Sequence, residues 1–99
     1  MCGIAGVAAR DPRALSGLLA MTRAQRHRGP DDEGYLLADS RRGRVHAYRG
    51  DDTVPAIPHP PLPAVPPEGC DLGMGHRRLA IIDLGPGGHG PMPSHDGKL

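Results

Sequence analysis

The chain begins with the run MCGIAGVA at residues 1–8, which sets both the first strand and the first candidate for chemistry. Ile4 and Val7 are β-branched, and the glycines between them allow another backbone to approach closely, so residues 2–9 are predicted to form a buried strand. Cys2 stands directly before this apolar run. Because residue 2 is small, we expect Met1 to be removed, which leaves a thiol and a free α-amine on the same residue.

An N-terminal cysteine has a direct chemical consequence. The α-amine has a pKa of about 7.7–8.0, so a useful fraction is neutral near pH 7 and can accept the proton of the thiol. A nucleophile assisted by its own amine is a known arrangement for acyl transfer. Cys2 is therefore a candidate nucleophile, although a cysteine at position 2 is also compatible with a chance feature of an N-terminal strand.

Composition limits the class of protein. The 99 residues suffice for one small domain, and the absence of Phe and Trp leaves a thin aliphatic core. A net charge of +1, without basic clusters that interleave with aromatics, argues against a nucleic-acid partner. No apolar run approaches the roughly 20 residues of a membrane span. Two cysteines without a preceding signal peptide favour a reducing, cytoplasmic location over a disulfide scaffold.

A helix and three further strands are predicted downstream. Asp11-Pro12 is a favourable helix start, and Leu15, Leu18, Leu19 and Thr22 have the spacing of one mostly apolar helical face that runs to about Gln25. Residues 33–38 and 44–48 are predicted as strands joined by a polar turn at 39–43, with Tyr35 and Leu37 on one side of the first. Residues 72–78 resume strand character, and an apolar run follows to residue 84.

The segment between Val54 and Pro67 contains seven prolines. That density excludes a regular helix or strand and predicts extended chain on the surface. An insertion between strands, at about residues 51–69, is favoured over a docking peptide for a proline-reading domain. At the other end of the chain, Lys98-Leu99 follows a turn signal and resembles the start of a strand, so we expect residues 1–99 to be a fragment.

Three motifs occur in a fixed order: MCGIAG at 1–6, RHRGPD at 26–31 followed by DEG, and GHRRLAIID at 75–83 followed by GHGPM at 88–92. Together they resemble the glutaminase domain of class II glutamine amidotransferases, most closely that of glutamine-hydrolysing asparagine synthetases. The resemblance covers nearly all of the chain except about residues 40–72. It implies an α+β fold, the αββα sandwich of N-terminal nucleophile hydrolases, with only its N-terminal part present. Residues 1–99 are thus expected to be a partial glutamine amidotransferase type 2 domain.

The resemblance also implies roles for individual residues. Cys2 matches the catalytic nucleophile that attacks the side-chain amide of L-glutamine and releases ammonia. Arg78 matches an arginine that holds the substrate's α-carboxylate, and a guanidinium presents the planar fork that suits this group. The wall of the glutamine pocket is expected at Leu79, Ala80, Ile81 and Ile82. A synthetase domain with ATP and Mg²⁺ would use the ammonia, and both are expected outside this segment, which therefore has no cofactor of its own.

The second motif is expected to be structural support near the site rather than chemistry. Gly29-Pro30 makes a sharp turn, and the arginines and Asp31 are expected to pair and hold that turn beside Cys2; the set is Arg26, Arg28, Gly29, Pro30 and Asp31. Asp32 and Glu33 are expected to be solvated turn residues. No metal site is expected, because the histidines and cysteines lack zinc-type spacing. Gly85–Gly90 lacks the Lys and Ser/Thr of a phosphate-binding loop.

Two departures from the family pattern matter. Gly90 stands where the family commonly has a glutamine before Pro-Met. Family members also continue into an Asn-Gly motif for the oxyanion hole and an acidic residue for the substrate's amine, and both would lie beyond Leu99. We therefore expect the isolated 99 residues to be inactive or nearly so. A truncated non-catalytic binding module or a remnant is the alternative, and the amide acceptor, aspartate or another carboxylate such as a sugar acid, stays open.

Overall fold

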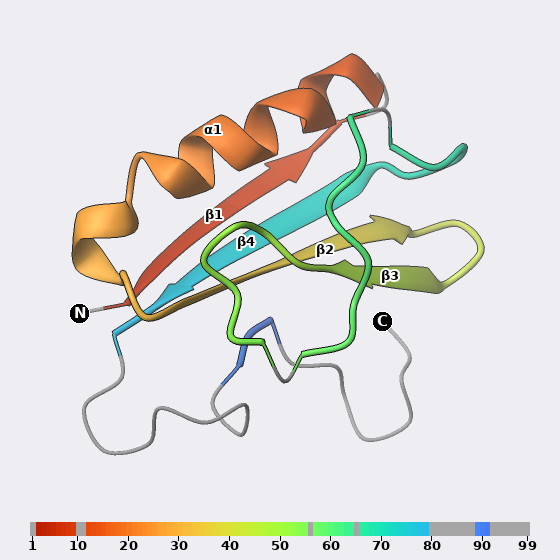
Figure 1. The fold of residues 1–99 in the computed structure, drawn as a ribbon. Helices are drawn as coiled ribbons and strands as arrows, with labels where there is room; N and C mark the ends of the chain where they lie inside the picture. The colour runs from red at the N-terminus through yellow and green to blue at the C-terminus, as the bar shows by residue number, and fades with distance from the viewer. Residues whose placement is uncertain (1, 10–11, 56, 65, 80–88, 92–99) are drawn as a thin grey trace.

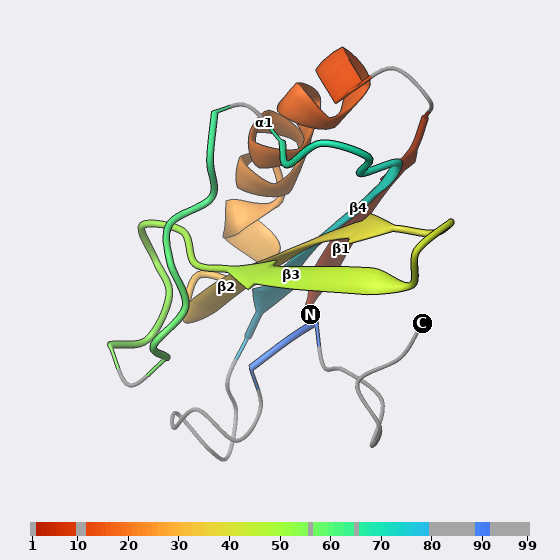
Figure 2. The same cartoon turned by 90° about the vertical axis from the view of Figure 1, so that its right-hand side faces the viewer.

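The computed structural model describes residues 2–9, 12–55, 57–64, 66–79 and 89–91. Within this part, four strands form one sheet in the order β1 (Gly3–Ala8), β4 (Leu72–Arg78), β2 (Asp32–Asp39) and β3 (Arg44–Tyr48), and each neighbouring pair is antiparallel. The helix α1 (Leu18–Arg23) lies along one face of the sheet (Figures 1 and 2). The predicted α+β class is confirmed, whereas the described residues do not include the second sheet of an αββα sandwich.

The bounds of the predicted strands agree closely with the observed ones, but the predicted burial of residues 2–9 is wrong, since within β1 only Gly3 is buried and Ile4 is 74% exposed. Those at 44–48 and 72–78 match β3 and β4 residue for residue, and β1 and β2 differ from the predictions by one residue at each end. The predicted single helix is instead divided into a 3₁₀ helix, η1 (Pro12–Gly17), and α1, which ends two residues earlier than expected. Gly17 lies at the junction, and glycine is a poor helix former. A second 3₁₀ helix, η2 (Arg26–Arg28), leads to the turn before β2.

The core lies between α1 and the sheet. Of the four residues on the predicted helical face, Leu15, Leu18 and Thr22 are buried and Leu19 is partly buried. The hydroxyl of Thr22 donates to the carbonyl of Leu18 at 2.9 Å, so it is buried without losing its hydrogen bond. A Cβ at Gly75 would overlap this hydroxyl, and the glycine therefore lets α1 approach β4 closely. The buried cluster comprises Leu15, Leu18, Tyr35, Leu37, Tyr48 and Cys70.

The two faces of the sheet differ in burial. On β4 the alternate residues from Gly73 to Arg77 face α1 and are buried, whereas Met74, on the other face, is 48% exposed. On the neighbouring strand Ile4 is 74% exposed. Residues 89–91 lie on this second face, on the side of the sheet away from α1 (Figures 1 and 2). The second face thus carries exposed apolar side chains that α1 does not cover.

The proline-rich segment contains no helix or strand among its described residues, as predicted. It is nevertheless attached to the rest of the domain by backbone hydrogen bonds and by a buried side chain. The backbone amide of Arg49 donates to the carbonyl of Pro60 at 2.8 Å. The backbone amide of Leu62 donates to the carbonyl of Arg49 at 3.1 Å. Ile57 is 7% exposed. The predicted surface position therefore fails for Ile57, because this side chain adds to the buried apolar surface of a domain with a thin core.

Candidate functional site

The register of the sheet brings three chain segments to one end. Gly3 faces Arg77 across the β1–β4 pair, so Cys2, one residue earlier, stands level with Arg78. On the other side of β4, Asp32 faces Arg78. Neighbouring strands lie about 5 Å apart. Figure 1 shows the start of β1, the end of β4 and the start of β2 together at the lower left. Cys2 directly precedes β1, and continuing the register by one residue sets it opposite Arg78, the last residue of β4.

The start of β1 is held by a side chain that follows α1. The side-chain amide of Gln25 donates from Nε2 to the carbonyl of Ile4 at 2.9 Å. The same side chain packs over Gly3, where a Cβ would overlap it. Cys2 itself is a free, exposed thiol, accessible to a small molecule from solution. Sequence reasoning did not identify Gln25, because its role depends on how the end of the helical region turns back over β1.

Residues 29–31 pack against the end of β4. The amide of Asp31 donates to the carbonyl of Arg78 at 3.0 Å, and Pro30 forms an isolated bridge with Arg78. Gly29 approaches so closely that a Cβ would lie 2.5 Å from the carbonyl carbon of Arg77. A side chain at position 29 therefore requires the backbone to move. The structure brings the turn, Arg78 and the Cys2 end of β1 together, while the chemical roles of these residues stay predictions.

The remaining predicted residues are placed as follows. Arg26 forms an ion pair with Asp52 at 3.0 Å, from Nε to Oδ2, and Arg28 is exposed. Leu79 directly follows Arg78 and is 37% exposed. Three members of the predicted glutamine-pocket wall lie outside the described residues: Ala80, Ile81 and Ile82.

The expectation that Asp32 and Glu33 are solvated is wrong, since each is 1% exposed. The chain enters β2 already at residue 32, and the proline-rich segment covers this position. Oδ1 of Asp32 accepts hydrogen bonds from its neighbour's amide at 2.9 Å and from the amide of Val54 at 3.1 Å. Oδ2 pairs with Nδ1 of His89 at 2.8 Å. These contacts satisfy the buried carboxylate.

Glu33 belongs to a buried ionic network centred on Arg77, which is completely buried. Nη1 of Arg77 contacts Oε2 of Glu33 and Nη2 contacts Oδ2 of Asp52, each at 2.9 Å. Nε donates to the carbonyl of Gly29 at 2.8 Å. The hydroxyl of Tyr35 also donates to Oε2 of Glu33, at 2.8 Å. Burial, aided by this carboxylate, raises the pKa of Tyr35 far above its usual value.

The imidazole of His76 lies on the second face of the sheet beside Gly90. Its Nδ1 is buried and has no hydrogen-bond partner among the described atoms. Burial is the largest cause that lowers the pKa of His76; Asp32 acts against it, and electrostatic interactions with His89 and Arg78 add to it.

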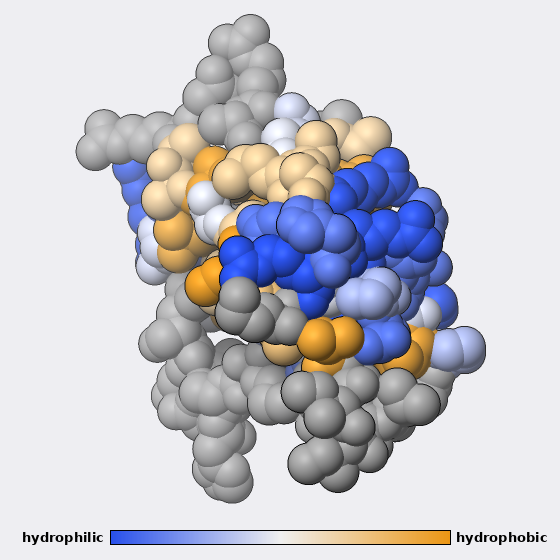
Figure 3. All heavy atoms as spheres, turned by 90° about the vertical axis from the view of Figure 1, so that its left-hand side faces the viewer, coloured by the Kyte–Doolittle hydropathy of each residue, from blue (hydrophilic) through white to orange (hydrophobic). Residues whose placement is uncertain are grey.

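The outer surface at the Cys2 end is mainly hydrophilic. Figure 3 looks at this end, where hydrophilic side chains cover the middle and one flank and apolar side chains form smaller patches. An exposed ion pair joins Arg23 to Asp51 at 2.7 Å. Among the described residues, no group of three or more His, Cys, Asp or Glu side chains is arranged to hold a metal ion. No helix in the described part of the chain is long and apolar enough to cross a membrane.

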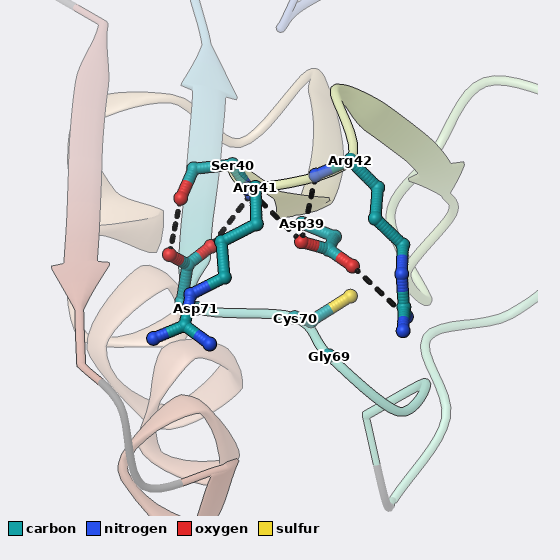
Figure 4. A pocket seen from close by; sticks show the side chains of 7 residues that line it. All are labelled: Asp39, Ser40, Arg41, Arg42, Gly69, Cys70 and Asp71. Atoms are coloured by element: carbon teal, nitrogen blue, oxygen red, sulfur yellow. Dashed lines mark hydrogen bonds and ion pairs between the residues drawn. The ribbon is translucent and has the colours of Figure 1, made fainter.

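A cavity of about 500 Å³ lies at the opposite end of the sheet from Cys2 (Figure 4). Asp39 accepts hydrogen bonds from the amides of Arg41 and Arg42 and pairs with the guanidinium of Arg42 at 3.4 Å. Asp71 accepts hydrogen bonds from the amide and the hydroxyl of Ser40. Both carboxylates therefore have partners within the chain: Asp71 ties the β2–β3 turn to the start of β4, and Asp39 braces the turn itself. The lining residues are Asp39, Ser40, Arg41, Arg42, Gly69, Cys70 and Asp71.

Comparison with known proteins finds a relative whose name indicates an activity. The chain is 30% identical over 93 residues to "Putative asparagine synthetase (glutamine-hydrolyzing) 2" of Methanocaldococcus jannaschii. The match covers 93% of this chain but 13% of that protein. No protein-family model and no solved structure matches the chain. The similarity supports a distant relationship to glutamine-hydrolysing asparagine synthetases.

Proposed function

We propose that these residues form the nucleophile-bearing part of a class II glutamine amidotransferase, similar to the glutaminase domain of asparagine synthetases. The observation that carries the proposal is the register that sets Cys2 level with Arg78 on the adjacent strand. Facing residues of an antiparallel pair project from the same face of a sheet. Continued by one residue, the register would bring a thiol nucleophile and a carboxylate-binding guanidinium to one face of the sheet, which supports a shared site for one small amino-acid substrate.

Cys2 supplies the covalent chemistry. Its thiol gives a proton to the α-amine, and the thiolate attacks the carboxamide carbon of glutamine. The carbon–nitrogen bond breaks as the amine returns the proton to the departing nitrogen, which leaves as ammonia. A γ-glutamyl thioester remains on Cys2. Water then attacks this carbonyl, the carbon–sulfur bond breaks, and glutamate and the free thiol are restored.

Arg78 would hold the α-carboxylate of glutamine through two parallel hydrogen bonds. Its position supports this role, because it ends β4 beside Cys2 and its backbone is fixed by Asp31 and Pro30. Leu79 continues from Arg78 and, with residues 80–82, would form the adjoining wall of the substrate site.

The rest of the proposed enzyme lies outside residues 1–99. By the resemblance, other residues supply the second sheet of an αββα sandwich, the oxyanion hole and the ATP- and Mg²⁺-dependent region that uses the ammonia. The exposed apolar side chains of Ile4 and Met74 are on the face that such a sheet would cover. A non-catalytic binding module is less well supported. Its main candidate for a docking peptide, the proline-rich segment, buries Ile57 and hydrogen-bonds to Arg49 within the domain.

The test uses the natural gene product that contains these residues. Intact mass measures whether Met1 is removed, and a diazoketone analogue of glutamine is used to label the protein. We expect Met1 to be absent and a single adduct to form on Cys2, with free glutamine protecting it. Cys2→Ala should abolish both labelling and the release of glutamate from glutamine.

The isolated 99-residue chain is a separate arm of this test. Loss of one oxyanion donor costs about 3–4 kcal/mol of barrier, so a chain without the whole oxyanion hole should release no measurable glutamate. Robust turnover that depends on Cys2 would contradict the proposal that residues 1–99 are an incomplete site. Retention of Met1, or no labelling of Cys2 in the natural product, would contradict the amidotransferase proposal itself.

A further inference from the structure

The two consecutive arginines at the end of β4 have different environments. Arg77 faces α1 and is completely buried, whereas Arg78 faces the opposite side and is partly exposed. The pattern follows from strand geometry, since successive side chains alternate between the faces of a sheet. The proposed function uses Arg78 and leaves the buried charge of Arg77 without a role.

The guanidinium of Arg77 joins three separate parts of the chain. It reaches the carbonyl of Gly29 in the turn before β2, the carboxylate of Glu33 inside β2, and the carboxylate of Asp52 at the start of the proline-rich segment. Each of its three nitrogens has one of these partners, which satisfies the buried cation.

The two acidic residues are themselves linked by a hydrogen bond. The backbone amide of Asp52 donates to Oε1 of Glu33 at 2.6 Å, and Nε of Arg26 pairs at 3.0 Å with Oδ2 of Asp52, the oxygen that Arg77 also contacts. Two cations and two anions therefore balance within this network, which we define as Arg26, Glu33, Asp52 and Arg77. The hydroxyl of Thr53 donates to the carbonyl of Glu33 at 2.6 Å and holds the following residue of the same turn against β2.

The network is connected to Arg78 through the backbone. Arg77 and Arg78 share a peptide bond, and Gly29 packs directly against that peptide. The carbonyl of Arg78 in turn accepts from Asp31, two residues after Gly29. Any change that lets the side chain of Arg77 or the turn shift therefore displaces the backbone that carries Arg78.

We propose that the network of Arg26, Glu33, Asp52 and Arg77 is the positioning device of the glutamine site. It fixes the backbone of Arg78 relative to Cys2, and the start of the proline-rich segment is accordingly part of the support of the site. This inference rests on the proposed function, and its residues act through Arg78 rather than on the substrate.

Asp52 offers the sharpest variant because its side chain is 24% exposed and tolerates substitution better than the buried Arg77 or Glu33. Asp52→Asn keeps the size and removes the charge that faces Arg77. Asp51→Asn is the matched control, since the adjacent Asp51 pairs with Arg23 on the surface, where its side chain is 82% exposed. Asp52→Glu restores the charge and serves as the conservative rescue.

The experiment measures two rates of alkylation of Cys2 in the natural gene product, one with the diazoketone analogue of glutamine and one with iodoacetamide. We expect Asp52→Asn to raise the half-saturating concentration of the glutamine analogue about tenfold, because a small displacement of a binding group has a large effect on a positioned reaction. Its iodoacetamide rate should be unchanged, since this reagent does not use Arg78. Asp51→Asn should match the wild type for both reagents, and Asp52→Glu should recover most of the affinity.

The outcomes separate the two proposals. If the wild type is labelled and Asp52→Asn is labelled with the same half-saturating concentration, the positioning role is wrong and the glutaminase proposal stands. Equal slowing with both reagents would mean a general disturbance of Cys2, which also contradicts the positioning of Arg78. If the wild-type protein itself is not labelled by the glutamine analogue, the proposed function fails and the positioning inference falls with it.

Discussion

Gly29 packs against the carbonyl of Arg77, so that a Cβ at position 29 would lie 2.5 Å from the carbonyl carbon of that residue. The atoms nearest to this Cβ are all backbone, and they cannot move aside by a change of rotamer. The requirement for glycine therefore comes from close approach, since Gly29 has a negative φ of −149° that other residues also adopt.

Gly29→Ala should destabilise the domain by about 1–3 kcal/mol, the range typical of overpacking. The matched control is Gly17→Ala, because no atom lies within 4 Å of a Cβ there and φ is −77°. This control should stabilise by about 0.4–1 kcal/mol through the unfolded state. Urea denaturation with equal m-values measures both changes. If Gly29→Ala unfolds at the same urea concentration as the wild type, the turn can move away from β4 without cost, and the prediction is wrong.

A second prediction concerns the buried charge of Arg77. Arg77→Leu leaves Glu33 buried at 1% exposure without its cation, and breaking a buried ion pair in this way costs about 3–5 kcal/mol. Arg23→Leu removes an exposed ion pair of similar length with Asp51 and should cost at most about 1 kcal/mol. The comparison is made by denaturant unfolding of the two variants. Similar small losses would mean that water or another group replaces Arg77.

Local sequence patterns predicted the strands well for a physical reason. The residues of β3 and β4 form short runs of strand-forming sequence that begin after a turn or a proline-rich stretch. Such runs are too short to favour a helix instead. The helical region was predicted less well. Its spacing gave the buried face of Leu15, Leu18 and Thr22 correctly, but it carried no information on the 3₁₀ geometry before Gly17.

The burial of Glu33 and Asp32 could not be predicted, because it depends on long-range pairing. A polar pair after Gly-Pro-Asp has the composition of a turn. These positions are buried because Glu33 pairs with Arg77, 44 residues later, and because the proline-rich segment packs over them. The alternation along β4 did contain one usable signal, since it places Arg77 and Arg78 on opposite faces. Cys2 and Arg78 were proposed from the motifs, and their facing positions come from the strand register.

A third prediction compares the two cysteines, which are both free. Cys2 is exposed, whereas Cys70 is 2% exposed, and its pKa is raised by burial first and then by Asp39 and Asp71. Each unit by which the pKa rises lowers the thiolate fraction about tenfold, and the thiolate is the reactive form. Iodoacetamide at pH 7.5 should therefore add once to the folded protein and a second time only after unfolding. Cys70→Ala should keep the first adduct and Cys2→Ala should lose it; rapid labelling of both thiols would contradict the burial of Cys70.

The last prediction concerns acid stability and His76. Because burial lowers the pKa of His76 in the folded protein, the unfolded chain binds a proton at this residue more readily. Between the lowered pKa and the ordinary value of about 6.5, the free energy of unfolding therefore rises with pH and is lost as the pH falls. His76→Gln removes this contribution, so its stability should decline less than that of the wild type between pH 7 and pH 5. His27→Gln, at an exposed position, should follow the wild-type curve. Parallel curves for the wild type and His76→Gln would mean that His76 accepts a proton without leaving its place on the sheet.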